Sequence, residues 1–476
     1  MNMKKICVAG LGYIGLPTAI IAAQSGFEVV GYDCDQSRVT RINQADPVIH
    51  EPEVKEKLQA VLAKNLFRAF THIQEADCFI IAVPTPCTDE KKADISYVLD
   101  VANAISTVIK KNNAVLIEST IPVGVTMQVA HCIAEKSGLS LDDFSCAYCP
   151  ERVLPGKIFY ELIHNTRVIG GVTASAAVHA SKFYKTFVQG QIFCTTAQTA
   201  ELVKLVENSA RDVQIAFANE VALIADSCGV DPYEVIELAN KHPRISLLQP
   251  RCGVGGHCIA IDPWFIVEGF NEQARLIRAA RTINDARPLH VFEKIKNVCE
   301  AWAIQHNKPC KIFLLGAAYK PDVDDLRESP AVQIARYCAQ NKHMDVRVCD
   351  PYITVEKAQQ FMLPQLIDFD SGYVWADVII CLVGHSAFMQ RKPLLLQNEK
   401  RCLDFCGLLF DTREHGYQVH ENNFLPAQMA SSNDSAQTYA TTKATSEPNV
   451  LEPSISEPST LEPSAMGTNT VERNIS

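Results

Sequence analysis

The residues with the clearest chemical potential lie in a glycine-rich segment at 253–262, which carries a cysteine and an aspartate four positions apart. Cys258 follows a run of glycines, and Asp262 closes the segment. A thiol at the start of a helix, near the positive end of its dipole and a lysine, is expected to be partly thiolate at neutral pH. Such a thiolate is a nucleophile, although most of the eighteen cysteines are expected to be small buried residues.

A second candidate pair lies on a long predicted helix at 199–227. Lys204 and Asn208 are four residues apart, so their side chains project from one face. A lysine on a helix is most often solvated. The pair therefore gains meaning only if the fold brings it to Cys258.

A third group of residues has the pattern of a dinucleotide site. Gly10-Leu11-Gly12-Tyr13-Ile14-Gly15 follows a predicted strand at 5–9 and opens a helix that runs to about Ser25. The glycines allow a tight turn and a close approach of a pyrophosphate to the helix N-terminus. Asp33 ends the next strand, where a carboxylate binds an adenosine ribose and repels a 2′-phosphate. The pattern favours NAD⁺ over NADP⁺; the alternative is a purely structural turn.

Two further turns follow predicted strands at 78–83 and 114–118. They are Pro84-Thr85-Pro86 and Ser119-Thr120-Ile121-Pro122. Open α/β sheets bind ligands at the carboxyl ends of their strands. Taken alone, both turns are equally well explained as simple chain reversals.

These candidates require an α/β architecture with more than one domain, because 476 residues exceed the size of one hydrophobic core. Alternating strands and helices predict a parallel, doubly wound Rossmann domain over residues 1–196. Long helical stretches then predict a connector over 197–305, with Asp231-Pro232 starting one of its helices. The expected fold is two Rossmann-like, doubly wound domains joined by a long helical connector.

The second Rossmann-like domain is predicted over 306–415, where strands are expected at 311–316, 345–349 and 376–383. Its first turn, Gly316-Ala317-Ala318-Tyr319-Lys320, lacks the dinucleotide pattern. It is therefore expected to bind something other than a dinucleotide. Residues 416–476 are rich in Ser, Thr and Pro with a recurring Glu-Pro pair, and they predict a disordered tail.

Composition excludes several classes of function. A formal charge of −10 argues against nucleic-acid binding, which depends on Lys and Arg that neutralise phosphates. No stretch approaches the roughly 20 apolar residues that span a bilayer, and the first residues do not form a signal peptide. We expect a cytoplasmic protein that does not bind membranes, without disulfides and without a metal site, since most cysteines lie in apolar segments and suit a reducing compartment.

Six ordered motifs together resemble the UDP-glucose/GDP-mannose dehydrogenase family over about residues 4 to 412. The motifs are Gly10 to Gly15, Glu118-Ser119-Thr120, Tyr148-Cys149-Pro150-Glu151-Arg152, Glu201 to Asn208, Gly253 to Asp262, and Lys320 with Arg327-Glu328-Ser329. The resemblance implies an NAD-dependent, four-electron oxidation of a UDP-sugar at its 6-hydroxymethyl group, in the synthesis of surface polysaccharides. It also implies a homodimer.

The resemblance implies particular roles for the residues already singled out. Cys258 becomes the nucleophile, and Lys204 with Asn208 stabilises the oxyanions of the thiohemiacetal and thioester stages. Asp262, with Thr120 holding a water, supplies base catalysis, and Glu151 helps to order the site. The implied cofactor-binding residues are Gly10, Gly12, Tyr13, Ile14, Gly15, Asp33, Arg38, Pro84, Thr85, Thr120 and Arg327. The implied substrate-binding residues are Arg152, Val153, Leu154, Lys204, Asn208, Arg244, Gly255 and Lys320.

The expected sugar is an N-acetylhexosamine. Family members specific for UDP-glucose usually carry a second glutamate four residues after the position of Glu151, where this chain has Pro155. Segments 149–156, 240–244 and 255–265 resemble the subgroup acting on UDP-N-acetylhexosamines, with UDP-N-acetyl-D-mannosamine preferred. UDP-N-acetylglucosamine and, less favoured, UDP-glucose stay open. Arg251-Cys252 replaces the Gly-Pro usual before the glycine segment, which puts substrate affinity in question.

Two rival functions remain on the sequence alone. A two-electron hydroxyacid dehydrogenase of the 6-phosphogluconate type would share the Rossmann and helical domains, but it needs no cysteine on a glycine segment. A non-catalytic sugar-nucleotide binder would use the Glu-Pro tail to hold partners. Intact Cys258, Lys204, Asn208 and Asp262 argue against the binder.

Overall fold

The computed structural model describes residues 3–49, 51–154, 156–396 and 401–410. Pro155 and the predicted tail at 416–476 lie outside these residues. The first sheet has the strand order β3-β2-β1-β4-β5-β6-β7-β8. Its strands are β1 (Lys5–Ala9), β2 (Glu28–Tyr32), β3 (Phe67–Phe70), β4 (Cys78–Ile81), β5 (Ala114–Ile117), β6 (Ser145–Tyr148), β7 (Arg167–Gly171) and β8 (Ile192–Thr196).

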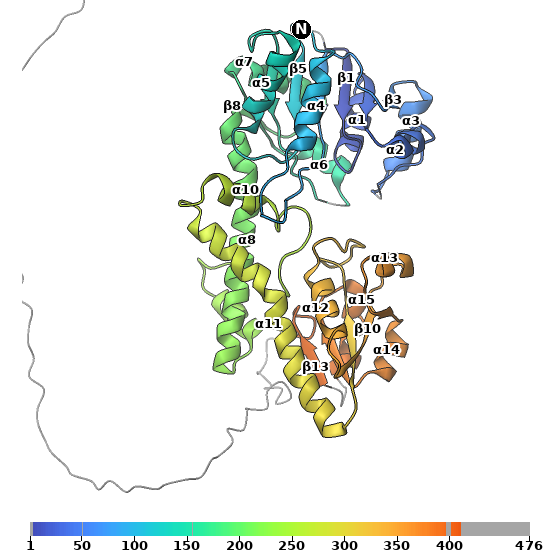
Figure 1. Cartoon of the computed structure of the whole chain (residues 1–476), viewed down its shortest axis with the longest axis vertical. Coiled ribbons are helices and arrows are strands. Elements are labelled where there is room, and N and C mark those ends of the chain that lie inside the picture. The colour runs from blue at the N-terminus through green and yellow to red at the C-terminus, as the bar shows by residue number, and fades with distance from the viewer. Residues whose placement is uncertain (1–2, 50, 155, 397–400, 411–476) are drawn as a thin grey trace, which may run out of the picture. The chain divides into compact units, whose positions relative to one another are not determined.

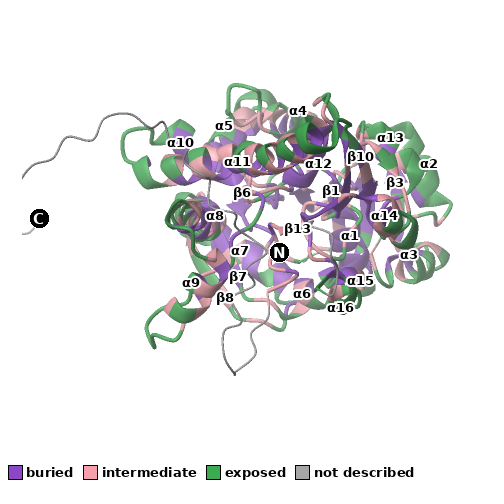
Figure 2. Cartoon of the chain, turned by 90° about the horizontal axis from the view of Figure 1, so that it is seen from below, coloured by how far each residue is buried: buried purple, intermediate pink, exposed green. Residues whose placement is uncertain are grey.

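The central strands form because they are short runs of apolar residues that helices cover on both faces. β1, β4 and β5 are buried along almost their whole length, as the parallel centre of such a sheet requires. Figure 2 shows this burial for β1. The covering helices are α1 (Gly15–Gln24), α2 (Gln36–Asn43), α3 (Val54–Ala63), α4 (Ser96–Ser106), α5 (Val125–Ser137), α6 (Ile158–His164) and α7 (Ala174–Tyr184). The doubly wound domain predicted from the sequence is confirmed.

One feature of this sheet corrects the prediction of a parallel sheet. β7 runs antiparallel to β6, while the other neighbouring pairs are parallel. The chain passes through the short helix α6 between the two strands and enters β7 in the direction opposite to β6. No local sequence pattern marks this reversal.

Two long helices dominate the connector. The connector helices are α8 (Ala197–Cys228), α9 (Pro232–Ala239), α10 (Asp262–Gly269) and α11 (Arg275–His306). α8 and α11 pack side by side (Figure 1), and the buried Arg281 of α11 donates from Nη1 to Oδ1 of buried Asp212 of α8 at 2.5 Å. Asp231 caps α9 with a proline at its first position, as the sequence predicts. Within the described ranges, no helix combines the length and apolarity that crossing a membrane requires.

The second sheet is smaller and entirely parallel, with the order β11-β10-β9-β12-β13. It is built from β9 (Cys310–Leu315), β10 (Met344–Cys349), β11 (Gln365–Leu366), β12 (Val378–Cys381) and β13 (Arg401–Asp404). Its helices are α12 (Pro330–Ala339), α13 (Val355–Gln360), α14 (Phe369–Trp375), α15 (Ser386–Met389) and α16 (Lys392–Leu396). The predicted fold class is confirmed, whereas the domain boundaries at 196, 305 and 415 stay predictions.

The second sheet repeats the centre of the first in detail. β11-β10-β9-β12-β13 matches β3-β2-β1-β4-β5 in order and direction. Gly10 and Gly316 end their strands with the same φ of +91°. Each donates its backbone N–H over 2.8 Å to the last residue of the neighbouring strand, Tyr32 and Cys349 respectively. The two Rossmann units thus share one local geometry.

Candidate active site

The turn between β1 and α1 contains three glycines. Close packing requires glycine at Gly10 and Gly15, whereas the space beside Gly12 is open. A Cβ on Gly15 would overlap the Gly10 carbonyl oxygen, and a Cβ on Gly10 would lie 2.5 Å from the Ala82 carbonyl oxygen. A Cβ on Gly12 would meet nothing within 4 Å. No side chain caps the N-terminus of α1, at Ile14. The turn therefore offers open backbone and a helix N-terminus to a diphosphate, which fits a dinucleotide.

Asp33 lies at the end of β2 and ties this turn to the sheet. The carboxylate is buried and accepts hydrogen bonds from the backbone N–H of Leu11 at 2.9 Å and of Asp35 at 3.0 Å. Arg38 of α2 donates to it from Nη1 at 2.9 Å. Asp33 and Arg38, both predicted at the cofactor site, therefore lie side by side against the glycine turn.

Glu51 is a site residue that the sequence did not indicate. Its carboxylate accepts hydrogen bonds from the Tyr13 hydroxyl and, at 2.8 Å, from the backbone N–H of Gly156. Burial raises the pKa of this carboxyl above its usual range. Glu51 thus connects the glycine turn with the loop that follows β6. No motif surrounds it, so only the fold identifies it.

The two turns predicted at the strand ends do lie together. The Thr85 hydroxyl donates to the Thr120 carbonyl oxygen at 2.6 Å, and the Ser119 hydroxyl donates to the Val83 carbonyl oxygen at 2.7 Å. Because β4 and β5 are parallel neighbours, their carboxyl ends meet at one edge of the sheet. Pro84 belongs to the same edge and is exposed.

Three residues of the predicted constellation come together around Asp262. Asn208 donates from Nδ2 to Oδ2 of Asp262 at 2.5 Å, and the Asp262 backbone N–H donates to the Cys258 carbonyl oxygen at 2.8 Å. Burial raises the pKa of Asp262 to about 6, while the positive charge of Lys204 and the Asn208 hydrogen bond lower it. Lys204 itself is buried. This carboxyl group can therefore gain and lose a proton near neutral pH.

The environment of Cys258 corrects the prediction of a helix-borne thiolate. α10 begins at Asp262, so Cys258 lies in the turn before the helix and not at its start. The residue as a whole is exposed, but its thiol is largely shielded from solvent, and this desolvation raises the pKa of the thiol. The negative charge of Asp262 raises it further. Lys204, Arg327 and Lys320 lower it, but less strongly. The thiol is protonated at neutral pH and needs a base to become a nucleophile.

The glycines before Cys258 are required because the second Rossmann domain packs against them. A Cβ on Gly255 would overlap the Glu328 carbonyl oxygen, and one on Gly256 would lie 2.8 Å from the ring of Tyr319. The backbone N–H of Gly256 donates to the Arg327 carbonyl oxygen at 3.2 Å. Segment 319–328 thus holds the loop that carries the thiol. In the sequence Tyr319 only marks a turn, and its contact with Gly256 arises from the fold.

Glu151 belongs to a buried group of charged residues next to the predicted substrate-binding residues Arg152 to Leu154. It accepts a hydrogen bond from Nη1 of Arg167 at 2.8 Å, and both side chains are buried. Glu118 is also buried and accepts from the Tyr184 hydroxyl at 2.8 Å. Burial raises the pKa of Glu118 to about 7, against the lowering effect of Arg167. Glu151 is thus placed to order the chain here, and its role in the reaction stays a prediction.

The predicted substrate residues after Glu151 use their side chains mainly within the protein. Arg152 donates from Nη1 to Glu207 of α8 at 2.5 Å. Val153 packs against the core of the first domain, and Leu154 is exposed. Backbone groups of Arg152 and Leu154 are likewise hydrogen-bonded within the protein, and the roles of this loop in substrate binding stay predictions.

The remaining predicted residues are spread over the connector and the second domain. Lys320 lies over the Tyr319 ring, 5.6 Å from its centroid, and its charge reaches Cys258. Arg327 pairs with Asp325 at 2.6 Å and is exposed. Arg244 is exposed beyond the end of α9. Lys320 and Arg327 therefore lie near enough to Cys258 for their charges to act on its thiol.

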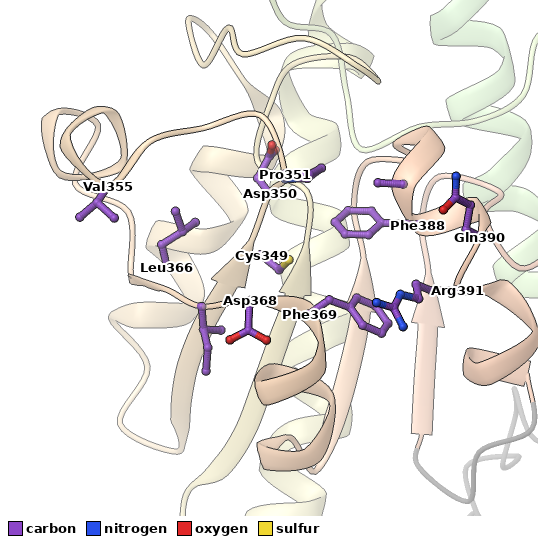
Figure 3. Close-up of a pocket in the computed structure, with 12 residues that line it drawn as sticks. Cys349, Asp350, Pro351, Val355, Leu366, Asp368, Phe369, Phe388, Gln390 and Arg391 are labelled. Carbon is purple, nitrogen blue, oxygen red and sulfur yellow. The ribbon is translucent and has the colours of Figure 1, made fainter.

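In the second domain, the turn after β9 is hydrogen-bonded to side chains of the same domain. Asp350 ends β10 as Asp33 ends β2, but it accepts from Ala317 N–H at 2.8 Å and from Nε2 of buried His385 at 3.0 Å. Both carboxylates are buried, but His385 takes the place beside Asp350 that Arg38 has beside Asp33. A cavity of about 540 Å³ lies beside Asp350, with Phe369 and Phe388 along one side (Figure 3). The second unit therefore differs from the dinucleotide turn of the first in the partner of this carboxylate.

Three family models match the chain in succession. They describe the UDP-glucose/GDP-mannose dehydrogenase family as an NAD binding domain at 4–188, a central domain at 198–286 and a UDP binding domain at 313–413. Together with the open glycine turn, these matches define an NAD-dependent oxidoreductase. The chain belongs to the UDP-glucose/GDP-mannose dehydrogenase family.

Individual relatives are similar over nearly their whole length. A UDP-N-acetyl-D-mannosamine dehydrogenase of Yersinia pestis is 44% identical over 83% of this chain and 96% of its own. An NDP-N-acetyl-D-galactosaminuronic acid dehydrogenase of Ralstonia solanacearum is 43% identical over 84% and 95%. A solved UDP-D-ManNAc dehydrogenase from Pyrococcus horikoshii has 37% identity and a TM-score of 0.77, covering 87% of this chain and 98% of its own.

The glycine turn gives a prediction that separates folding from cofactor binding. Gly12→Ala should leave the thermal unfolding midpoint unchanged, because its Cβ meets no protein atom. It should weaken NAD⁺ binding roughly 10-fold to 100-fold, since a methyl group blocks the close approach. Gly15→Ala should instead lower the unfolding midpoint, because its Cβ overlaps the Gly10 carbonyl. Calorimetric titration with NAD⁺ and thermal unfolding measure both; equal effects of the two variants on stability would contradict the expected difference between the two positions.

The charges around Cys258 predict opposite shifts in its reactivity. The pH midpoint for alkylation of Cys258 by iodoacetamide should lie above the usual range of a cysteine. Lys204→Met should move this midpoint upward and Asp262→Asn should move it downward, because the two charges act in opposite directions. Mass spectrometry of the modified peptide follows the reaction. A midpoint below the usual range, or shifts of the same sign, would show that the charges are arranged differently.

Proposed function

We propose that this protein oxidises the 6-hydroxymethyl group of UDP-N-acetyl-D-mannosamine to a carboxylate, in two NAD⁺-dependent steps, for surface polysaccharide synthesis. The observation that carries the proposal is the Cys258, Asp262 and Asn208 arrangement, with buried Lys204 beside it. A simple two-electron hydroxyacid dehydrogenase needs no nucleophilic thiol. This arrangement supplies one, together with a base and two donors for an oxyanion.

The residues of the first domain that would hold NAD⁺ are those of the open glycine turn, with Asp33 toward the ribose. NAD⁺ held there would supply the hydride acceptor for each of the two oxidations. Thr85 and Thr120, at the neighbouring strand ends, border the place where the reacting carbon is expected. Arg38, Pro84 and Arg327 complete the proposed cofactor residues.

The residues around Cys258 have separate tasks after the first oxidation. Asp262 removes the proton from the thiol, and Cys258 sulfur then forms a bond with the aldehyde carbon. Lys204 and Asn208 stabilise the resulting oxyanion of the thiohemiacetal. After the second oxidation gives a thioester, Asp262 and Thr120 direct a water to its carbonyl carbon. The carbon–sulfur bond breaks, the acid leaves and Cys258 regains its proton.

The choice of sugar rests on the relatives. Several relatives about 44% identical are named UDP-N-acetyl-D-mannosamine dehydrogenases. The Ralstonia relative is named for N-acetyl-D-galactosaminuronic acid, which makes that epimer the second candidate. UDP-N-acetylglucosamine and UDP-glucose are the further alternatives, and Pro155, which disfavours UDP-glucose, lies outside the described residues.

Arg251-Cys252, which replaces the Gly-Pro usual in the subgroup, is held in place by hydrogen bonds to its backbone. The Arg251 N–H donates to Oδ1 of Asn219 at 2.8 Å, and Nε of Arg287 donates to the Arg251 carbonyl oxygen at 3.1 Å. The Cys252 thiol is buried and contacts the Leu382 carbonyl oxygen at 3.5 Å. The exposed Arg251 side chain is available to the diphosphate of the substrate.

Counting NADH tests the proposed reaction. Purified protein with limiting UDP-N-acetyl-D-mannosamine and excess NAD⁺ should release two NADH per sugar, with slower release from the galactosamine, glucosamine and glucose analogues. Cys258→Ser should form no acid above about one-thousandth of the normal rate, because a hydroxyl is a far weaker nucleophile. It should still bind NAD⁺. One NADH per sugar, or normal acid formation by the variant, would refute the thioester route.

The oligomer proposed for this protein is a homodimer. Exposed apolar side chains recur along α8 at Leu202, Val206, Phe217 and Ile224. An apolar stripe on a long helix suits a second copy of the same helix. Arg244, exposed near α9, would then face the partner's site.

Light scattering should give twice the chain mass, and Phe217→Glu should shift the protein toward monomer, because the charge lies in the apolar stripe. Lys136→Glu, an exposed change away from α8, is the matched control. A dimer that Phe217→Glu leaves intact would place the interface elsewhere.

A cytoplasmic location is proposed from the cysteines. Those in the described part of the chain form no disulfides, and most of them are buried. Thiols in such number suit a reducing compartment.

A further inference from the structure

Glu201 is a fully buried carboxylate that the reaction scheme does not use. It lies on α8 one turn before Lys204, on the same face as Lys204 and Asn208. A buried carboxylate is costly unless hydrogen bonds or a cation compensate it. The hydrogen-bond donors that Glu201 meets within the described residues are not cations, and all of them belong to one other helix and the residue before it.

Those partners form the N-terminus of α5. Oε2 accepts from the Gly124 N–H at 2.7 Å, and Oε1 accepts from the Thr126 N–H at 2.8 Å and from its hydroxyl at 2.5 Å. The N-cap position of α5 is Gly124, which has a φ of +99° and no side chain to cap the helix. Glu201 thus replaces the missing cap from another helix. The positive end of the α5 dipole stabilises its charge.

The segment between β5 and α5 is therefore fixed at both ends. Near β5, the Thr85 hydroxyl holds the Thr120 carbonyl at 2.6 Å. At its other end, Glu201 holds Gly124 and Thr126. Thr120 belongs to the segment that these anchors hold. The same carboxylate belongs to the helix that presents Lys204 and Asn208, so one side chain links the two halves of the site.

We propose that Glu201 is a positioning residue that sets the placement of Thr120 relative to Lys204 and Asn208. The proposal rests on the function proposed above. Glutamate suits this role because two oxygens accept three donors. A glutamine would accept at Oε1 but would turn an NH₂ group toward the Gly124 N–H, and one of the two helices would have to shift.

Steady-state kinetics of the full-length protein test the proposal. Glu201→Gln should lower kcat between roughly tenfold and one-hundredfold, as misplacement of reacting groups does, with little change in KM for NAD⁺. Thr126→Val should act in the same direction but less, because the backbone N–H donors remain. The double variant should lose less than the product of the two single losses. Glu135→Gln, on the outer surface of the capped helix, is the matched control and should behave as the unaltered protein.

A second readout does not depend on turnover. The groups whose charges act on Cys258 are Asp262, Lys204, Arg327 and Lys320. Removal of the Glu201 charge would by itself lower the pKa of a nearby thiol or leave it unchanged. Displacement of Lys204 raises it. We therefore expect Glu201→Gln to move the pH midpoint of Cys258 alkylation upward.

The outcomes separate the hypotheses. An upward alkylation shift, with kcat reduced by more than any loss of folded protein explains, supports the positioning role. A reduced kcat that only follows a reduced folded fraction, with the alkylation midpoint unchanged, overturns it, as does behaviour equal to Glu135→Gln. If the unaltered protein oxidises none of the UDP-sugars, the proposed function fails, and the alkylation shift still decides the role of Glu201.

Discussion

The hydrogen bond from Asn208 to Asp262 joins the long helix α8 to the loop that carries the nucleophile. The Asp262 carboxyl group is buried away from water, and this burial raises its pKa to about 6. Lys204 opposes that rise, so the carboxyl group stays available as a base near neutral pH. A thiol with a raised pKa depends on such a neighbour. The residues proposed as nucleophile, base and oxyanion donors therefore form one unit.

That unit is completed by a domain distant in sequence. Segment 319–328 packs so closely on Gly255 and Gly256 that neither position admits a side chain. The second Rossmann domain thus shapes the catalytic loop, while its own turn is hydrogen-bonded to Asp350, which His385 contacts. The repeated fold has been divided between two tasks. One copy keeps an open glycine turn, and the other supports the loop bearing the thiol.

The sequence predicted the regular elements well because their signals are local. β1 has its predicted bounds, and the cap at Asp231 lies where Asp-Pro indicated it. The prediction of a parallel sheet was wrong at β7, which runs antiparallel to β6 and which no local motif marks. The expected position of Cys258 at the start of a helix was also wrong, since α10 begins at Asp262.

The sequence by itself determined the fold class and the dinucleotide turn, because glycine spacing and apolar alternation are properties of neighbouring residues, and its family resemblance indicated the residues around Cys258. Only the tertiary structure decided the protonation of Asp262 and the reason for the glycines at 255 and 256. It also decided that Glu201 caps a helix 75 residues earlier in the chain. Burial, charge and close packing arise between segments far apart in sequence, so no local pattern carries them.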